Sequence, residues 1–212
     1  MKPLHQLGAL AELSSLYEAK KNPIRKRLDE FSNITPDDYF YELVYCLLTP
    51  QSSAVNAEKA VQLLSKSGFH ESEIDPEPLL HQKDFYIRFH KTKAKHLVVI
   101  KQQFPLIRRH LLNGSSGEEL REWLVKNVKG LGWKEASHFL RNIGHRNLAI
   151  LDRHILRNLL RFRVIRRLPK SLTPKHYQAI EKKFMRFSKK IGIAMDELDL
   201  LFWSMETGEM RK

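Results

Sequence analysis

Apolar side chains recur every three or four positions along most of the chain, the spacing that places them on one face of an α-helix. No segment alternates apolar and polar residues as a half-buried strand does, and no repeat of solenoid length is present. We therefore predict an all-α fold. The predicted helical segments are 1–30 (one helix or two), 35–48, 54–67, 91–103, 106–112, 118–128, 133–143, 155–160, 174–191 and 196–203.

Prolines and small polar residues mark where these helices begin and end. Thr35-Pro36 and Thr173-Pro174 each place a capping threonine before a proline in the first helical turn. Ser116 and Glu119 have the spacing of a capping box, which predicts a helix start at this point. Pro105 is expected to interrupt the helix before it, because proline lacks a backbone donor.

Two glycines, Gly130 and Gly132, separate the helical patterns of residues 118–128 and 133–143. Glycine adopts the backbone angles of a tight hairpin at little cost, and it leaves the amides at the start of the second helix uncovered. That helix end carries partial positive charge and suits a phosphate. An ordinary helix–loop–helix connection explains the two glycines equally well, so both interpretations stay open.

Lys134 and Asp152 are the candidate catalytic residues. Lys134 falls in the first turn of the second helix, where the helix dipole disfavours a cation and favours the neutral, nucleophilic amine. Asp152 precedes the apolar-periodic run 155–160, at the position of a helix N-cap. A plain cap accounts for this aspartate by itself, although a cap would also hold a catalytic carboxylate in one place.

The chain is strongly basic: its 212 residues include 37 Lys and Arg against 24 Asp and Glu, which gives a net charge of +13. This charge favours a polyanionic partner, with nucleic acid first, although an ordinary basic protein or one that binds anionic membranes fits as well. No apolar run approaches the length of a membrane span, and the N-terminus lacks a signal-peptide core. We expect a cytoplasmic protein that does not bind membranes.

The cysteine and histidine content argues against a metal or cofactor. A single cysteine, Cys46, allows neither an internal disulfide nor a four-cysteine iron–sulfur cluster, and its apolar surroundings predict a core residue. The ten histidines form no H-x-x-x-H or H-E-x-x-H spacing. We therefore predict no catalytic metal and no cofactor.

The segment VKGLGWKEA, with the aspartate eighteen positions after Lys134, resembles the helix-hairpin-helix superfamily of base-excision DNA glycosylases. In that superfamily the last hairpin position holds the catalytic lysine of bifunctional members. More closely, KEASHFLRNIG followed by AILDRHILR, with LLTPQSSA upstream, resembles the compact prokaryotic 8-oxoguanine DNA glycosylase/AP lyases. The resemblance covers most of the chain.

The resemblance implies two helical subdomains with the active site in the cleft between them. One is a central subdomain, 35–145, with the hairpin at about 118–143; the other combines 1–34 with 146–212. The implied site residues are Lys134 and Asp152 for catalysis, Gly130, Gly132, His154, Gln51 and Ser52 for DNA binding, and Phe85, Trp203 and Lys212 for the damaged base.

Purely structural interpretations of these residues stay open. Ser52 and Ser53 each fit a helix N-cap, His154 fits a solvent-facing helix position, and Phe85 and Trp203 fit the core. Composition predicts a frayed end at Lys212. The hairpin carbonyls near Lys126, Val128 and Leu131 hold an optional structural ion in such folds.

The resemblance also implies a reaction. Lys134 attacks C1′ of an extruded nucleotide, the base leaves, and the resulting Schiff base permits β-elimination of the 3′ phosphate. The expected partner is double-stranded DNA that contains 8-oxoguanine or abasic sites, bound by a monomer in the cytoplasm near the nucleoid. Two alternatives remain: a glycosylase/lyase for another oxidised base, and a non-catalytic helix-hairpin-helix DNA-binding module, which leaves the lysine–aspartate pair unexplained.

Overall fold

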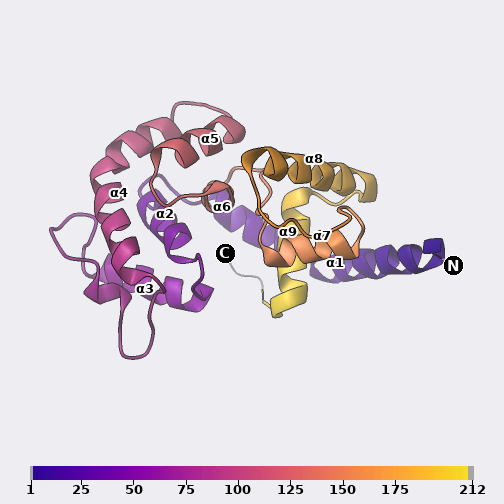
Figure 1. The fold of residues 1–212 in the computed structure, drawn as a ribbon, viewed down its shortest axis with the longest axis horizontal. Helices are drawn as coiled ribbons and strands as arrows, with labels where there is room; N and C mark the ends of the chain where they lie inside the picture. Colours follow the sequence, from indigo (N-terminus) through magenta and orange to yellow (C-terminus); the bar gives the residue numbers. More distant parts are fainter. Residues whose placement is uncertain (1, 210–212) are drawn as a thin grey trace. The chain divides into compact units, whose positions relative to one another are not determined.

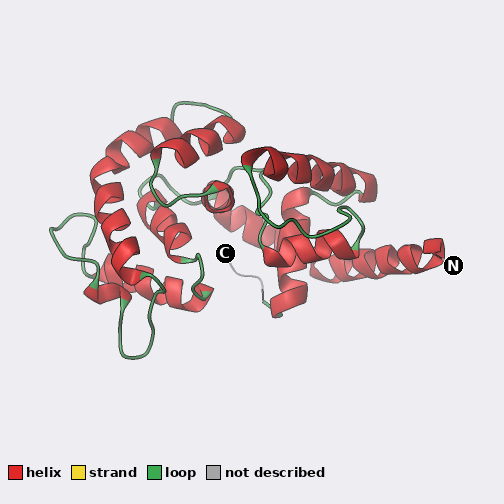
Figure 2. Ribbon diagram, viewed as in Figure 1, coloured by secondary structure: helices red, strands yellow, loops and turns green. Residues whose placement is uncertain are grey.

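The computed structural model describes residues 2–209, with side chains from residue 8 onward. Helices and loops account for this part of the chain, and its only β contact is an isolated bridge between His81 and Tyr86 (Figure 2). The all-α prediction is confirmed. The helices are α1 (Lys2–Ser32), α2 (Tyr39–Leu48), α3 (Ala54–Lys66), the 3-10 helix η1 (Pro78–Leu80), α4 (His90–Leu111), α5 (Gly117–Asn127), α6 (Trp133–Asn142), α7 (Arg153–Arg161), α8 (Pro174–Ile191) and α9 (Met195–Thr207).

The chain forms two compact units (Figure 1). The central unit consists of residues 34–145 and contains α2 to α6. The terminal unit combines residues 2–33 with 146–209 and contains α1, α7, α8 and α9. Within residues 2–209, no helix is both long enough and apolar enough to cross a membrane.

In the central unit, α2 is the helix on which α3, α4 and α6 pack. Its sequence YFYELVYCLL is apolar on all sides, as a helix surrounded by other helices requires. Cys46 is fully buried in it, as expected. A buried polar contact joins α2 to α6, because the Asn142 amide donates to Glu42 at 3.1 Å.

The prediction that Pro105 interrupts a helix is wrong, because α4 runs without a break from His90 to Leu111. The residues on both sides of the proline continue a single buried face. Packing of that face outweighs the one backbone bond that proline removes. The members of the face are Lys93, Leu97, Ile100, Phe104, Ile107 and Leu111.

The predicted helix start at Thr35-Pro36 is also displaced. Residues 35–38 form a turn in which the Thr35 hydroxyl donates to Asp38 at 2.9 Å, and α2 begins only at Tyr39. By contrast, Thr173 caps α8 as predicted, with its side chain accepting from the His176 amide.

In the terminal unit, α9 is the central helix and packs against α1, α7 and α8. Rings from three segments stack in this core, with Phe202 of α9 lying 5.5 Å from Phe162 and 5.9 Å from Phe184 between ring centroids. Helix α1 is joined to α9 by polar contacts, since Tyr17 and Arg25 both donate to Glu197 at 2.8 Å.

Candidate active site

A capping box begins the first helix of the hairpin, as the sequence predicts. The Ser116 side chain accepts from the Glu119 amide at 3.3 Å, and the Glu119 carboxylate accepts from the Ser116 amide at 2.8 Å. Between α5 and α6 the chain turns at residues 128–132. Val128 and Leu131 are buried on the inside of this turn, and the Leu131 amide donates to the Val128 carbonyl at 3.2 Å.

The two hairpin glycines differ in their backbone conformation and in their neighbours. Gly130 has a φ of +89°, and a Cβ there would lie 2.5 Å from Nδ1 of His96. Gly132 has an ordinary φ of −86°, but a Cβ there would lie 2.8 Å from the Glu135 carboxylate. A side chain is therefore disfavoured at Gly130 by conformation and by contact, whereas at Gly132 it would only require the flexible end of the Glu135 side chain to move.

Gly132 is the N-cap of α6 and offers no side chain to cap the helix. Its carbonyl accepts the first intrahelical bond, from the Ala136 amide at 2.9 Å. The amides of the first turn therefore have no N-cap side chain as acceptor. An uncapped helix start of this kind carries partial positive charge and is suited to an anion.

Lys134 lies in that first turn, with its side chain 28% exposed and its ammonium 3.1 Å from the Glu135 carboxylate. Glu135 was not among the predicted site residues. Its charge attracts the Lys134 ammonium and opposes the effect of the helix dipole. The amine of Lys134 is thus held in place by its sequence neighbour.

Lys93 of α4 is a second lysine in this region, and only 8% of it is exposed. Its ammonium donates to the carbonyls of Leu48 and Pro50, both at 2.7 Å, and lies 3.5 Å from the Ser52 hydroxyl. Burial lowers the pKa of Lys93 to about 8; the charge of Lys134 lowers it further, and Glu135 acts in the opposite direction.

The predicted helix 91–103 did not distinguish Lys93 from its basic neighbours, so the burial of this lysine was not predicted. A signal was available, however. Lys93 precedes Leu97 by four positions and Ile100 by seven, so it is in register with the apolar face of α4. A lysine in register with an apolar face predicts a buried cation.

The turn between α2 and α3 carries two predicted DNA contacts. Gln51 is exposed and has a φ of +56°, a left-handed conformation that residues other than glycine rarely adopt. The Ser52 hydroxyl accepts from the Arg88 amide at 3.0 Å. The serine cap predicted at Ser52 or Ser53 is confirmed for Ser53, which caps α3 by accepting from the Asn56 amide, and is wrong for Ser52.

Phe85 lies half-buried in the loop before α4, with the Lys59 ammonium 5.8 Å from its ring centroid. Six predicted site residues therefore belong to the central unit. They are Gln51, Ser52, Phe85, Gly130, Gly132 and Lys134.

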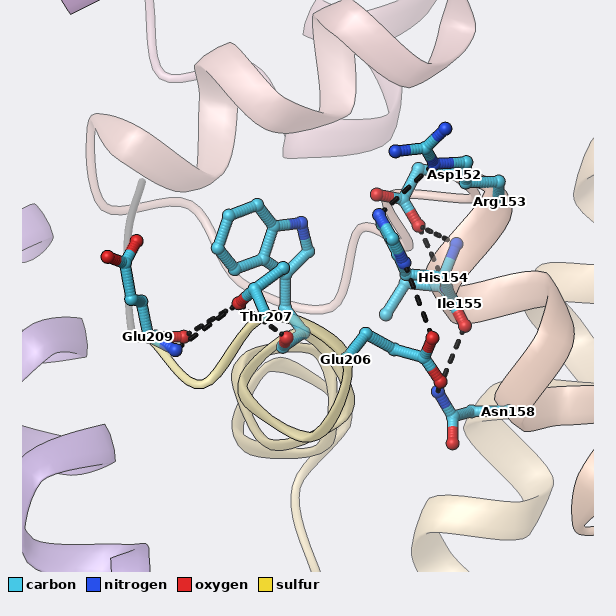
Figure 3. Close-up of polar contacts among 9 residues, drawn as sticks. Asp152, Arg153, His154, Ile155, Asn158, Glu206, Thr207 and Glu209 are labelled. Atoms are coloured by element: carbon cyan, nitrogen blue, oxygen red, sulfur yellow. Dashed lines mark hydrogen bonds and ion pairs between the residues drawn. The ribbon is translucent and has the colours of Figure 1, made fainter. Parts of the chain in front are cut away.

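In the terminal unit, Asp152 is the N-cap of α7 (Figure 3). Its Oδ1 accepts from the backbone amides of His154 and Ile155, both at 2.8 Å. Its Oδ2 has no hydrogen-bond partner among residues 8–209, whose side chains are described. The expected cap is confirmed, and it fixes the carboxylate through one oxygen while leaving the other unengaged.

His154 is only 15% exposed, so its interpretation as a solvent-facing residue is wrong. Its Nδ1 lies 3.6 Å from the Glu206 carboxylate, and its Nε2 accepts from Arg153 at 3.2 Å. Asn158 donates to the same Glu206 carboxylate at 3.2 Å (Figure 3). The ring of Trp203 meets His154 edge to face at 6.2 Å.

Trp203 itself is half-buried and lies in the terminal unit with Asp152 and His154. The predicted base contact Lys212 lies outside the described residues. Across the part of the chain that carries described side chains, no three His, Cys, Asp or Glu residues are grouped to hold a metal ion.

The capped α5, the glycine turn and α6 define a helix-hairpin-helix protein. A family model described as 8-oxoguanine DNA glycosylase matches residues 24–193. The chain belongs to this family.

Known relatives match along nearly the whole chain. An 8-oxoguanine DNA glycosylase/AP lyase of Fusobacterium nucleatum is 42% identical over 211 residues, which cover 95% of this chain and 96% of the relative. The 8-oxoguanine DNA glycosylase of Thermotoga maritima, known from a crystal structure, has 33% sequence identity to this chain. The two structures match with a TM-score of 0.85, over 98% of this chain and 100% of the other.

A further solved structure contains DNA. It is the 8-oxoguanine glycosylase/lyase of Methanocaldococcus jannaschii in complex with a 15mer DNA that contains 8-oxoguanine. It is 31% identical to this chain, with a TM-score of 0.86, and the match covers 96% of this chain and 99% of the other.

Proposed function

We propose that this protein is a bifunctional base-excision enzyme that removes 8-oxoguanine from duplex DNA and then cleaves the strand at the abasic site. The observation that carries the proposal is the family match over residues 24–193, which includes both the hairpin with Lys134 and the α7 cap with Asp152. The relatives of similar length are named 8-oxoguanine DNA glycosylase/AP lyase.

Lys134 is the proposed nucleophile. Its neutral amine attacks C1′ of the extruded nucleotide, the C1′–N9 bond breaks, and the base leaves with a proton. The sugar ring opens to give a Schiff base between C1′ and Nζ. A proton then leaves C2′, the C3′–O bond breaks, and the 3′ phosphate departs.

Asp152 is the proposed electrostatic partner of this reaction. Its carboxylate either assists proton loss from the Lys134 amine or stabilises the positive charge that develops on the sugar. The contacts of the carboxylate support both roles. Oδ1 is occupied by two amides at 2.8 Å, which orient the group, and Oδ2 is left for the substrate.

The uncapped start of α6 is the proposed contact for a backbone phosphate of the duplex. Gly130 and Gly132 keep side chains away from its amides, and the net charge of +13 adds affinity that does not depend on sequence. Gln51, Ser52 and His154 are proposed as further DNA contacts. Phe85, Trp203 and Lys212 are proposed as contacts of the oxidised base.

We further infer that the enzyme works as a monomer at the nucleoid in the cytoplasm. One chain supplies both Lys134 and Asp152, and the substrate is chromosomal DNA. Sedimentation of the free and DNA-bound protein tests the first point, with the mass of one chain per duplex expected; fluorescence microscopy of a tagged chain tests the second.

Product analysis on a panel of duplexes tests the reaction and the lesion together. Duplexes of one sequence would carry 8-oxoguanine, an oxidised pyrimidine, or guanine. We expect free 8-oxoguanine and a cleaved strand from the first duplex only. Equal or faster release of the oxidised pyrimidine would support a glycosylase for another base, and tight binding without any release would support the non-catalytic module.

A further inference from the structure

Glu206 is a carboxylate in the last turn of α9 that the proposed reaction does not use. A carboxylate at the C-terminus of a helix faces the negative end of the helix dipole, so local electrostatics disfavour it there. Its side chain is 30% exposed and reaches across to α7, the helix that Asp152 caps. Contacts with this second helix offset the unfavourable position of Glu206 within its own.

Two side chains of α7 contact the Glu206 carboxylate (Figure 3). Nδ2 of Asn158 donates to Oε1 at 3.2 Å, and Nδ1 of His154 lies 3.6 Å from Oε2. Because Nε2 of His154 accepts from Arg153, a neutral imidazole carries its proton on Nδ1, the nitrogen that faces the carboxylate. Each oxygen of Glu206 therefore faces a nitrogen of α7 that carries a proton.

Asn158 gives the contact a fixed point. It is 1% exposed, and the nitrogen that donates to Glu206 also donates to the His154 carbonyl at 3.0 Å. An amide nitrogen that serves two acceptors in the core cannot move without leaving one of them unpaired, which is costly. The last turn of α9 is thus attached to an immobile side chain of α7.

Trp203 lies on the same face of α9 as Glu206, because the two residues are three positions apart. Its ring meets the imidazole of His154 edge to face at 6.2 Å, and its carbonyl accepts from the Thr207 hydroxyl at 2.9 Å. Helix α9 ends at Thr207, and helix ends fray when nothing fixes them. Glu206 fixes the turn that follows Trp203 and so restrains the position of the indole.

Asp152 does not depend on this contact. Its Oδ1 is held by the amides of His154 and Ile155, both of which belong to the helix that Asp152 caps. Loss of the Glu206 side chain would leave these two bonds in place. Such a change would therefore release Trp203 without releasing the Asp152 carboxylate.

We propose that Glu206 is a positioning residue for base recognition: by binding Asn158 and His154 of α7, it holds the Trp203 indole in the place where it contacts the base. This inference rests on the proposed function, in which Trp203 contacts the oxidised base. Glu206 then acts on the step that engages the base, and it does not act on the step that follows base loss.

Two substrates separate these steps, because β-elimination at a preformed abasic site requires no contact with a base. Glu206→Ala should slow single-turnover excision of 8-oxoguanine about tenfold, since a small misplacement of a positioning group has an effect of this size or larger. Its β-elimination should stay within about twofold of the wild type. Glu12→Ala is the matched control, because it removes an exposed carboxylate that pairs with Arg161 of α7 at 3.4 Å; both steps should be unchanged.

Glu206→Gln keeps an oxygen that can accept from Asn158, so it should excise 8-oxoguanine within about threefold of the wild-type rate. Wild-type excision by Glu206→Ala would overturn the inference, and so would an equal loss of both steps. An excision loss in Glu206→Gln as large as that in Glu206→Ala would also overturn it, because the charge and not the contact would then be required. A wild-type protein that neither excises the base nor cleaves abasic DNA would instead contradict the proposed function.

A double-mutant cycle tests the link to Trp203 directly. In the Trp203→Ala background, Glu206→Ala should change excision by less than about twofold, because the side chain that Glu206 positions has been removed. Losses that simply multiply in the double variant would show that Glu206 acts independently of Trp203, and the inference would fail.

Discussion

Oδ1 of Asp152 accepts a hydrogen bond from the backbone amide of Ile155 at 2.8 Å, and the same oxygen accepts one from His154. Asparagine at this position would preserve both bonds through its own Oδ1 and remove only the charge. Capping and catalysis by this residue can therefore be separated by substitution.

The melting temperature of Asp152→Asn should lie within about 2 °C of the wild-type value, because Asn and Asp cap helices almost equally well. Its single-turnover excision of 8-oxoguanine should fall at least about 100-fold, the usual contribution of a catalytic carboxylate. Asp152→Ala should lose the same activity and also about 1 kcal/mol of stability. Near-normal excision by the asparagine variant would reduce Asp152 to a helix cap.

Gly130→Ala should be more destabilising than the same substitution at another glycine with a positive φ. Gly114 is the matched control, since its φ is +81° and nothing lies within 4 Å of a Cβ there. Gly114→Ala should cost about 1 kcal/mol for conformation alone. Gly130→Ala should cost about 1–3 kcal/mol more, because its Cβ would lie 2.5 Å from His96.

Denaturant titration measures this difference, and His96→Ala identifies its cause. In the His96→Ala background the two glycine variants should become similar, because the contact has been removed. An equal cost of both variants in the wild-type background would mean that the hairpin tolerates a side chain at Gly130.

Gln51→Gly should separate stability from DNA binding. Glycine relieves the left-handed strain at φ +56°, so the free energy of unfolding should stay the same or rise by up to about 1 kcal/mol. Binding to a duplex with 8-oxoguanine should weaken, because the proposed polar contact is lost. Arg163 has a similar left-handed conformation, with φ +57°, and lies in the terminal unit. Arg163→Gly should therefore change the free energy of unfolding as Gln51→Gly does, without the same loss of DNA affinity. Unchanged affinity in Gln51→Gly would argue against a DNA contact at this residue.

Glu197 should make the stability of the protein sensitive to acid. Burial by itself raises the pKa of Glu197, but hydrogen bonds from Arg25 and Tyr17 outweigh burial and lower the pKa below its ordinary value. A carboxyl with a depressed folded-state pKa stabilises the fold above its unfolded-state pKa of about 4.3. That stabilisation is lost as the pH falls through the folded-state value.

Glu197→Gln should therefore cost about 1–3 kcal/mol at pH 7, and the difference from the wild type should shrink as the pH falls below about 4. Glu18→Gln, an exposed carboxylate on α1, should cost less than about 1 kcal/mol at any pH. Denaturant titration at a series of pH values measures both. A difference for Glu197→Gln that is constant with pH would contradict the charge-based account.

Several features that depend only on neighbouring residues were predictable from the sequence, although the helix start predicted at Thr35-Pro36 was displaced. The capping box of Ser116 and Glu119 and the cap at Asp152 involve partners within three positions, so spacing alone identified them. The predicted break at Pro105 failed because packing of the α4 face outweighs local propensity. Burial of Lys93 depends on carbonyls more than forty positions away, which local patterns do not specify.

The site residues also divide into those that residue type and spacing predicted and those whose contacts depend on the three-dimensional structure. The sequence identified Lys134 and Asp152 by residue type and spacing, and it missed Glu135, whose contact with Lys134 depends on side-chain direction. The contact of His154 with Glu206 of α9 was not predicted, because these residues are far apart in the sequence and only the fold brings them together. The assigned roles in catalysis, DNA binding and base recognition stay predictions.

Borohydride trapping on a duplex with one 8-oxoguanine tests the central claim most directly, because reduction converts the Schiff base into a stable covalent bond. The wild type and Lys129→Gln, an exposed lysine of the same hairpin, should each give a protein–DNA adduct, and peptide mapping should place it on Lys134. Lys134→Gln should give none while still binding the duplex. An adduct of similar yield with Lys134→Gln, or one mapped to another residue, would contradict the assignment of Lys134 as the nucleophile.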